Sequence, residues 1–197
     1  MISIVVGVLG AVVRPVAAQE ETYSGNGDDV IRIEKPSADR PALLVIQGNQ
    51  QGRHFAVIGY TASRERTGVL VNTTDPYSGI VPLDLPPTEN TALLEVSATG
   101  PWSIDVYPIG AAQQVEVPGS FDGEGDRVLW IDGEPSTADI SGNRAGRHFA
   151  VIAYGRYGNG QGVLVNTTNS YDGTVLLPRD VLLLEVTGTG SWTIRLE

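Results

Sequence analysis

One segment of 30 residues occurs twice in this chain of 197 residues, and it constrains the fold more than any other feature. Gly52 to Val81 aligns without a gap to Gly146 to Val175, and 18 of the 30 positions are identical. A duplicated segment of this length predicts two similar folding units. Residues that both copies share are expected to maintain the fold, whereas residues that differ are the better candidates for function.

The repeat continues on both sides of this block. Tyr23 to Asp28 corresponds to Phe121 to Asp126, and both end in Gly-x-Gly-Asp. Downstream, Leu-Leu-Glu-Val and Gly-x-Trp-x-Ile follow in the same order in both copies. We therefore expect one unit over residues 19–110, a linker over 111–120 and a second unit over 121–197. Each unit is long enough to bury a core of its own.

Strand signals are frequent and helix signals are nearly absent, which predicts an all-β fold. Short alternating or β-branched runs are separated by Gly, Asn, Asp and Pro. About seven short strands per unit are typical of an antiparallel sandwich, so we predict two tandem antiparallel β-sandwiches of jelly-roll or Ig-like type. The strands expected in the first unit are Val30–Glu34, Ala42–Gln47, His54–Tyr60, Gly68–Asn72, Ile80–Leu83, Leu93–Ala98 and Trp102–Tyr107.

The last strand of each unit shows which residues face the core. Trp102, Ile104 and Val106 alternate with polar residues, and so do Trp192 and Ile194 in the second copy. Because a shift of one residue would bury charged side chains, the apolar set must face inward. Both tryptophans are therefore predicted to be core residues.

Composition excludes some partners and cofactors. The formal net charge is −10, and clustered Lys and Arg are absent, so nucleic acid and anionic membrane surfaces are not expected partners. With no cysteine, disulfides and thiolate ligands are excluded.

The N-terminal segment is apolar from Ile2 to Val13 and is followed by Val16-Ala17-Ala18. Small residues at these positions are typical of a signal-peptidase site, so residues 1–18 are predicted to be a signal peptide cleaved before Gln19. The alternative is an apolar strand that the mature protein keeps. The run is too short to span a bilayer and no C-terminal anchor is expected.

Neither histidine nor the glycine-rich entry loop predicts a metal or catalytic site. His54 and His148 occupy equivalent positions with no local catalytic partner. Ser24 to Ile31 partly matches a calcium-binding nonapeptide, but the match occurs once and Arg127 replaces its aspartate in the second copy. We therefore expect a turn in which the aspartate binds its own backbone, and no cofactor, with calcium kept as the alternative.

Differences between the copies suggest binding or interface residues. Trp130 replaces Arg32 on the outward side of its strand. Together with Tyr154 and Tyr157 it is predicted to form either an aromatic platform for sugars or, preferably, an interface patch.

The strand at Leu43 also differs, because Leu-Leu-Val-Ile becomes Thr-Ala-Asp-Ile in the second copy. We expect the second-copy strand to be an edge protected by Asp139. In the first copy, Leu43 and Val45 are expected on a bare apolar edge that another chain covers.

The strings GVLVNTT-x-x-Y-x-G and LLEV-x-x-x-G-x-W-x-I resemble a poorly characterised module of secreted and cell-surface bacterial proteins. More distantly, the units resemble jelly-roll accessory domains of secreted hydrolases. The resemblance implies extracellular β-modules without an activity. We therefore expect a secreted, non-enzymatic structural or adhesion module at the cell surface, whose partner is a second copy, a cell-surface component or a glycan. The alternatives are a filament subunit that uses strand addition and a carbohydrate-binding module.

Overall fold

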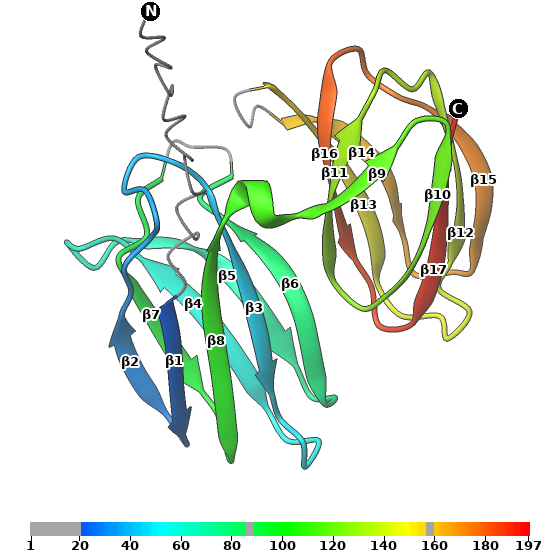
Figure 1. Cartoon of the computed structure of the whole chain (residues 1–197). Coiled ribbons are helices and arrows are strands. Elements are labelled where there is room, and N and C mark those ends of the chain that lie inside the picture. Colours follow the sequence, from blue (N-terminus) through cyan, green and yellow to red (C-terminus); the bar gives the residue numbers. More distant parts are fainter. Residues whose placement is uncertain (1–20, 86–88, 157–159) are drawn as a thin grey trace, which may run out of the picture.

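The protein is all-β in the computed structural model, which describes residues 21–85, 89–156 and 160–197 (Figure 1). Among these residues the only helical element is one 3-10 turn, Ile109–Ala111 (η1). The strands form four sheets, two built by residues 21–112 (the first half) and two by residues 113–197 (the second half). Within the described residues, no helix has the length and apolar character needed to cross a membrane.

The first half has eight strands in two four-stranded sheets. Their orders are β1-β8-β3-β6 and β2-β7-β4-β5, and every pair is antiparallel. The strands are β1 (Glu21–Asn26), β2 (Asp29–Arg32), β3 (Ala42–Gly48), β4 (Phe55–Tyr60), β5 (Arg66–Thr73), β6 (Tyr77–Leu83), β7 (Leu93–Ser97) and β8 (Pro101–Pro108).

The second half repeats these strand orders as β10-β17-β12-β15 and β14-β13-β16-β11, and adds β9 beside β11. The β9–β11 pair is parallel, which differs from the fully antiparallel prediction. The strands are β9 (Gln113–Glu116), β10 (Gly119–Glu124), β11 (Arg127–Asp132), β12 (Thr137–Gly142), β13 (Phe149–Gly155), β14 (Gly160–Thr167), β15 (Tyr171–Leu176), β16 (Val181–Thr187) and β17 (Ser191–Leu196).

Each half buries a separate hydrophobic cluster between its two sheets, which makes the fold sandwich-like. Trp102 and Trp192 are 4% and 3% exposed, so their prediction as core residues is confirmed. Each indole packs on a strand glycine, Gly25 or Gly123, where a Cβ atom would collide with the ring. The first glycine of each Gly-x-Gly-Asp motif is therefore required by this close approach.

Two predicted edges are wrong. β3 lies between β8 and β6, and β12 lies between β17 and β15, so both are central strands. The polarity of a strand does not indicate whether it lies at the edge of its sheet. Even in a central strand, every second side chain points to the outer face of the sheet and can be polar. Asp139 projects from that face and accepts a hydrogen bond from the Thr174 hydroxyl at 2.5 Å.

Two further expectations need correction. The Gly-x-Gly-Asp motif was predicted as a turn, but its first two residues, Gly25 and Asn26, belong to strand β1, and only Gly27 and Asp28 turn. The linker predicted over 111–120 contains β9 and the beginning of β10. The tertiary pairing with β8, β11 and β17 makes these segments strands despite their weak periodicity.

Candidate functional site at the contact between the two halves

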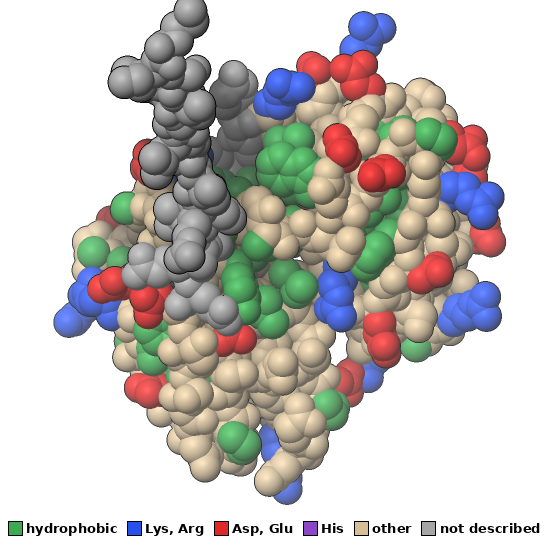
Figure 2. Space-filling view, viewed as in Figure 1, with side chains coloured by type: hydrophobic (Ala, Val, Ile, Leu, Met, Phe, Trp, Pro, Cys, Tyr) green, Lys and Arg blue, Asp and Glu red, His purple; other side chains and the backbone are tan. Residues whose placement is uncertain are grey.

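The most distinctive site is a contact between the outer sheet faces of the two halves. Leu43 from the first half is 2% exposed and clusters with Val128, Tyr154 and Leu183 of the second half. Ile80, Tyr107 and Trp130 pack around this cluster. Figure 2 shows hydrophobic side chains gathered near the middle of the molecule, where the halves meet. The contact therefore has an apolar centre.

The register of the strands explains why one copy of this face is apolar. Leu43 pairs with Tyr107 and Pro82. At the equivalent place in the second half, Thr137 pairs with Leu176 and lies beside Glu197, whose N–H donates to the Thr137 carbonyl. The aliphatic side chains of the first half are thus covered by the second half. The second-half counterpart is not covered and is more polar, although Leu176 on it is 81% exposed.

A polar clasp lies beside the apolar centre. The Tyr77 hydroxyl of the first half donates to Asp126 Oδ2 at 2.6 Å, and the Ile80 N–H donates to the Asp126 carbonyl at 2.9 Å. Within its own half, Asp126 Oδ1 accepts from the Gly188 N–H at 2.9 Å. Asp126 thus closes a turn of the second half and binds the first half with its other oxygen. Arg147 and Asp75 add an exposed ion pair at 3.2 Å.

Burial changes the titration of the clasp. Burial raises the pKa of Asp126, and this is opposed by the hydrogen bonds from Tyr77 and Gly188 and by the charges of Arg127 and His148. Burial and the adjacent Asp126 carboxylate also raise the pKa of the Tyr77 hydroxyl. Tyr77 therefore keeps its proton and is a hydrogen-bond donor near neutral pH.

A second tyrosine–carboxylate pair lies on the same sheet face. The Tyr154 hydroxyl donates to Glu185 Oε2 at 2.6 Å. Burial raises the pKa of Glu185, and the nearby charge of Asp126 raises it further. The equivalent pair in the first half, Tyr60 and Glu95, makes the same 2.6 Å bond on a face that the second half does not cover. Both halves therefore form this tyrosine–glutamate hydrogen bond, and the contact between the halves buries only the pair of the second half.

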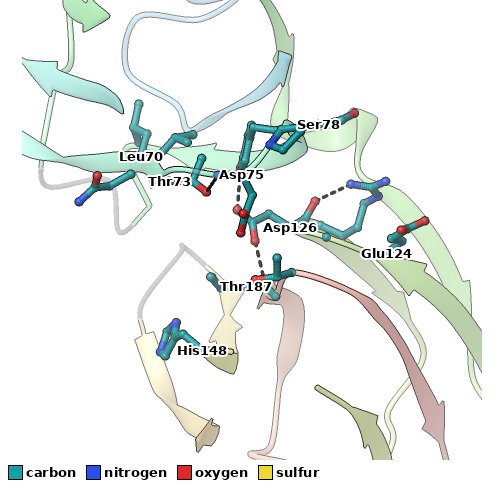
Figure 3. Close-up of a pocket in the computed structure, with 16 residues that line it drawn as sticks. Leu70, Thr73, Asp75, Ser78, Glu124, Asp126, His148 and Thr187 are labelled. Atoms are coloured by element: carbon teal, nitrogen blue, oxygen red, sulfur yellow. Dashed lines mark hydrogen bonds between the residues drawn. The ribbon is translucent and has the colours of Figure 1, made fainter. Parts of the chain in front are cut away.

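A polar cleft of about 490 Å³ opens beside the clasp (Figure 3). The first half contributes the ends of β5 and β6, and the second half contributes Glu124 to Arg127, His148 and Thr187 to Thr189. Both Asp126 oxygens already accept hydrogen bonds, and His148 Nε2 lies 3.1 Å from the Asn166 side chain. The carboxylate and the imidazole are therefore both hydrogen-bonded within the chain.

The part of the chain that the structure describes contains no set of ligands for calcium or another metal ion. No group of three or more His, Asp or Glu side chains lies together in these residues. At the predicted calcium loop, Asp28 Oδ1 accepts from the Ala98 N–H at 2.9 Å. The aspartate was expected to bind its own backbone, whereas it joins its turn to the β7–β8 turn.

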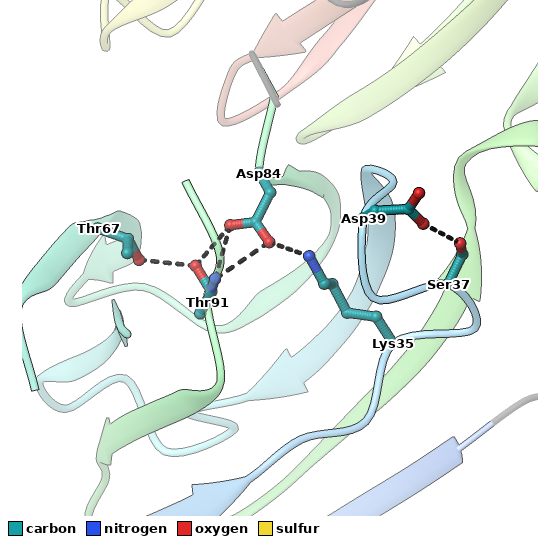
Figure 4. A network of polar contacts seen from close by, with 6 residues as sticks. All are labelled: Lys35, Ser37, Asp39, Thr67, Asp84 and Thr91. Carbon is teal, nitrogen blue, oxygen red and sulfur yellow. Dashed lines mark hydrogen bonds and ion pairs between the residues drawn. The ribbon is translucent and has the colours of Figure 1, made fainter. Parts of the chain in front are cut away.

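A buried polar network stabilises a loop of the first half (Figure 4). Lys35 Nζ lies 2.5 Å from Asp84 Oδ2, and both side chains are at most 5% exposed. Thr91 donates to Asp84 from its N–H and its hydroxyl, and the Thr91 and Thr67 hydroxyls are 2.7 Å apart. The buried charges are thus paired and fully hydrogen-bonded, which is the condition for keeping them in a core.

The structure brings three of the predicted site residues, Leu43, Trp130 and Tyr154, into the contact between the halves. Tyr154 is 7% exposed and Trp130 is half-buried between the halves, so the structure places both at an interface and gives the Tyr154 ring no open face. Leu43 is covered by the second half of the same chain, and Val45 is half-buried on the same face. Tyr157 lies outside the described residues, as does the predicted signal peptide.

Sequence reasoning missed two groups. Asn49 and Asn143 are buried, adopt positive φ, and bind the backbone at Asp75 and Asn169 through their amide nitrogens. The repeated Gly-Asn-x-x-Gly-Arg-His string contained this signal. The role of Asp126 had no such signal, since Asp28 is its identical counterpart.

Tyr77→Phe tests the clasp. Removing the hydroxyl leaves the Asp126 carboxylate without one of its donors, which should lower the free energy of unfolding by about 1–3 kcal/mol. Chemical denaturation of the purified protein measures this. Tyr171→Phe is the matched control because Tyr171 occupies the equivalent position outside the contact, and it should change stability by less than about 0.5 kcal/mol. Equal losses in the two variants would contradict the clasp.

The raised pKa values of Asp126 and Glu185 predict greater stability in mild acid. The ordinary values are 3.8 and 4.5, and both are raised in the folded state. The folded protein therefore binds protons more tightly than the unfolded chain. This contribution is fully present below the ordinary pKa values and is lost as pH rises through the folded ones.

Denaturation between about pH 5 and about pH 7.5 tests this expectation. The free energy of unfolding should fall over this interval, and Glu185→Gln should make the fall smaller. An unchanged pH dependence in Glu185→Gln would show that burial at this contact does not perturb Glu185.

Comparisons with known proteins add no function. No protein family matches the chain, and no curated protein resembles it significantly. Among solved structures, a conserved protein of unknown function from Pseudomonas aeruginosa is 8% identical with a TM-score of 0.27, covering 91% of this chain and 80% of that one. A cAMP-independent protein kinase A regulatory subunit from Trypanosoma cruzi, bound to guanosine, is 13% identical with a TM-score of 0.28, covering 90% and 72%. HutD from Pseudomonas fluorescens is 11% identical with a TM-score of 0.27, covering 91% and 78%. Scores this low establish no shared fold, so the function is inferred from the chain itself.

Proposed function

We propose that the chain is an exported, non-enzymatic protein of two tandem β-sandwiches, of jelly-roll or Ig-like type, that acts at the cell surface as a structural or adhesion module. The observation that supports this most is the contact between the halves, in which one sheet face covers another around Leu43 and Val128. The contact joins two small cores into one larger unit. Such a unit is suited to bearing load or presenting a surface.

The side chains of the cleft favour a structural role over catalysis. An active site needs groups whose proton or electron pair is available to a substrate. Asp126 uses both oxygens to hold the two halves, and Tyr154 donates its hydroxyl to Glu185. The groups of the contact whose pKa values are raised, namely Tyr77, Asp126, Tyr154 and Glu185, are therefore already engaged in hydrogen bonds.

The carbohydrate-binding alternative has less support. It requires aromatic rings that a sugar can stack against, and the buried Tyr154 ring offers none. The filament alternative was based on strand addition by the N-terminal apolar segment, which lies outside the described residues, or by a bare strand edge at Leu43, but β3 is central. Self-association through sheet faces instead of strand edges is considered below.

Export and surface attachment are tested together in a bacterial host that secretes proteins. We expect the full chain to be recovered outside the cytoplasm with Gln19 as its first residue, determined by N-terminal sequencing. Purified, labelled protein should then bind saturably to the envelope of the producing organism. Retention in the cytoplasm with Met1 intact would contradict export, and absence of saturable binding would contradict the adhesion role.

A further inference from the structure

The contact between the halves joins two different surfaces, so it is heterologous. The first half contributes the outer face of the β1-β8-β3-β6 sheet, and the second half contributes the outer face of its five-stranded sheet. Because the halves are repeats, each also has the surface that the other one uses. A heterologous contact can repeat between molecules when both of its surfaces remain free at the ends.

We call these two remaining surfaces the head face and the tail face. Strand register identifies both faces. On the head face Val30 pairs with Glu95, which corresponds to the pair of Val128 and Glu185 in the second half. On the tail face Asp139 pairs with Thr174, which corresponds to the pair of Val45 and Ile80 in the first half. The head face, on β2-β7-β4, consists of Val30, Arg32, Ile58, Tyr60, Leu93 and Glu95. The tail face, on β17-β12-β15, consists of Thr137, Asp139, Thr174, Leu176, Arg195 and Glu197.

Both faces expose large apolar side chains. Val30 on the head face is 61% exposed, whereas its counterpart Val128 is 1% exposed inside the contact. Leu176 on the tail face is 81% exposed. Valine and leucine at such exposures mark surfaces that gain free energy when another surface covers them.

The counterparts of the two clasp residues, Asp28 for Asp126 and Tyr171 for Tyr77, lie on the head side and the tail side. Asp28 uses Oδ1 to accept from the Ala98 N–H, as Asp126 uses Oδ1 for Gly188. Among the described residues, its Oδ2 has no counterpart of the Tyr77 bond. The Tyr171 hydroxyl lies over Gly173 as the Tyr77 hydroxyl lies over Gly79. An acceptor on the head side and a donor on the tail side are therefore both available.

The remaining replacements change both surfaces together. On the second-half surface of the contact and its head-face counterpart, Trp130 corresponds to Arg32. On the opposite surface, Val45 and Tyr107 correspond to Asp139 and Glu197. Trp130 and Tyr107 pack against the same cluster inside the molecule, and their counterparts Arg32 and Glu197 carry opposite charges, which favours pairing in this one orientation.

Other charges weaken this pairing. Arg195 lies beside Asp139 on the tail face, and Asp29 and Asp172 occupy the places that Arg127 and Ser78 have in the internal contact. The contact between molecules is therefore weaker than the internal one, reversible and sensitive to salt.

We propose that copies of this chain associate head to tail, with the tail face of one molecule covering the head face of the next as the first half covers the second. The association deepens the structural role proposed above and rests on it. Its test needs neither export nor envelope binding, so the two proposals fail separately.

Sedimentation velocity of the purified protein, from about 10 µM to about 1 mM at low salt, tests the association. We expect the mean sedimentation coefficient to rise with concentration and to fall when salt is added. Val30→Asp should remove the rise. Val163→Asp is the matched control because Val163 is also 61% exposed but lies outside both faces, and it should leave the rise intact.

Mixing two variants tests the orientation. Val30→Asp blocks the head face and Leu176→Asp blocks the tail face, so each variant alone should be monomeric. An equimolar mixture should form a dimer and nothing larger, because one intact tail then meets one intact head. A monomer at every concentration for the unmodified chain would overturn the proposal. Dimerisation of Leu176→Asp alone would overturn it in favour of head-to-head pairing.

Discussion

Leu43→Asp is expected to separate the two halves while each half keeps its core. Leu43 is 2% exposed among Val128, Tyr154 and Leu183, and no cation lies in this cluster. An unpaired carboxylate buried there costs about 3–5 kcal/mol. The halves should part and rehydrate instead of burying the charge.

Three measurements follow this separation. The free energy of unfolding from denaturant titration should fall, the radius of gyration from small-angle scattering should rise, and the emission of Trp130 should shift to longer wavelength. Thr137→Asp is the matched control because it places the same side chain at the equivalent, uncovered position of β12. If both variants lose the same stability, the loss comes from aspartate in a central strand and the contact is not its cause.

Trp192→Ala is expected to cost about 3–5 kcal/mol of unfolding free energy. The indole is 3% exposed, lies against Gly123 and packs 5.8 Å from the Phe121 ring. Its Nε1 donates to the Gly125 carbonyl at 2.9 Å, so truncation leaves a cavity and removes that donor. Since Gly123 has no side chain, the strand opposite cannot fill the space.

The losses of stability expected for alanine at the three tryptophans can be compared. Trp102→Ala should cost a similar amount, because Trp102 makes the same 2.9 Å bond to Gly27 and lies against Gly25. Trp130→Ala should cost less than half as much, since Trp130 is half-buried at the contact and in neither core. Thermal and chemical denaturation of the three variants would decide this. A loss for Trp130→Ala as large as for Trp192→Ala would contradict the assignment of Trp130 to the contact.

Much of the local structure was predictable from the sequence because it depends on neighbouring residues. The strands around Phe55, Val71 and Ile104 occur close to where alternation placed them. Strand β1 was missed since its polar alternation has meaning only beside Trp102, which is 77 residues away from Gly25 in the sequence and directly opposite it in the sheet.

The candidate site was predictable only in part. Trp130, which replaces Arg32, packs against the contact cluster. Leu43 was expected to be covered by another chain, whereas the second half of the same chain covers it. The sequence could not indicate the cover, because alternation shows which side chains share a face but not which surface lies against it. Asp28 and Asp126 are the clearest example, since identical residues in identical turns differ only in whether Tyr77 reaches them.

The sequence by itself determined that the chain repeats an all-β unit, that each unit has a tryptophan in its core, and that two outer faces differ in polarity. These features follow from local periodicity and from the comparison of two copies. The tertiary structure decided the strand order, the central position of β3 and β12, and the burial of Leu43, Tyr154 and Glu185 between the halves. Strand order and face-to-face contact depend on pairs that are distant in sequence, so no local pattern specifies them.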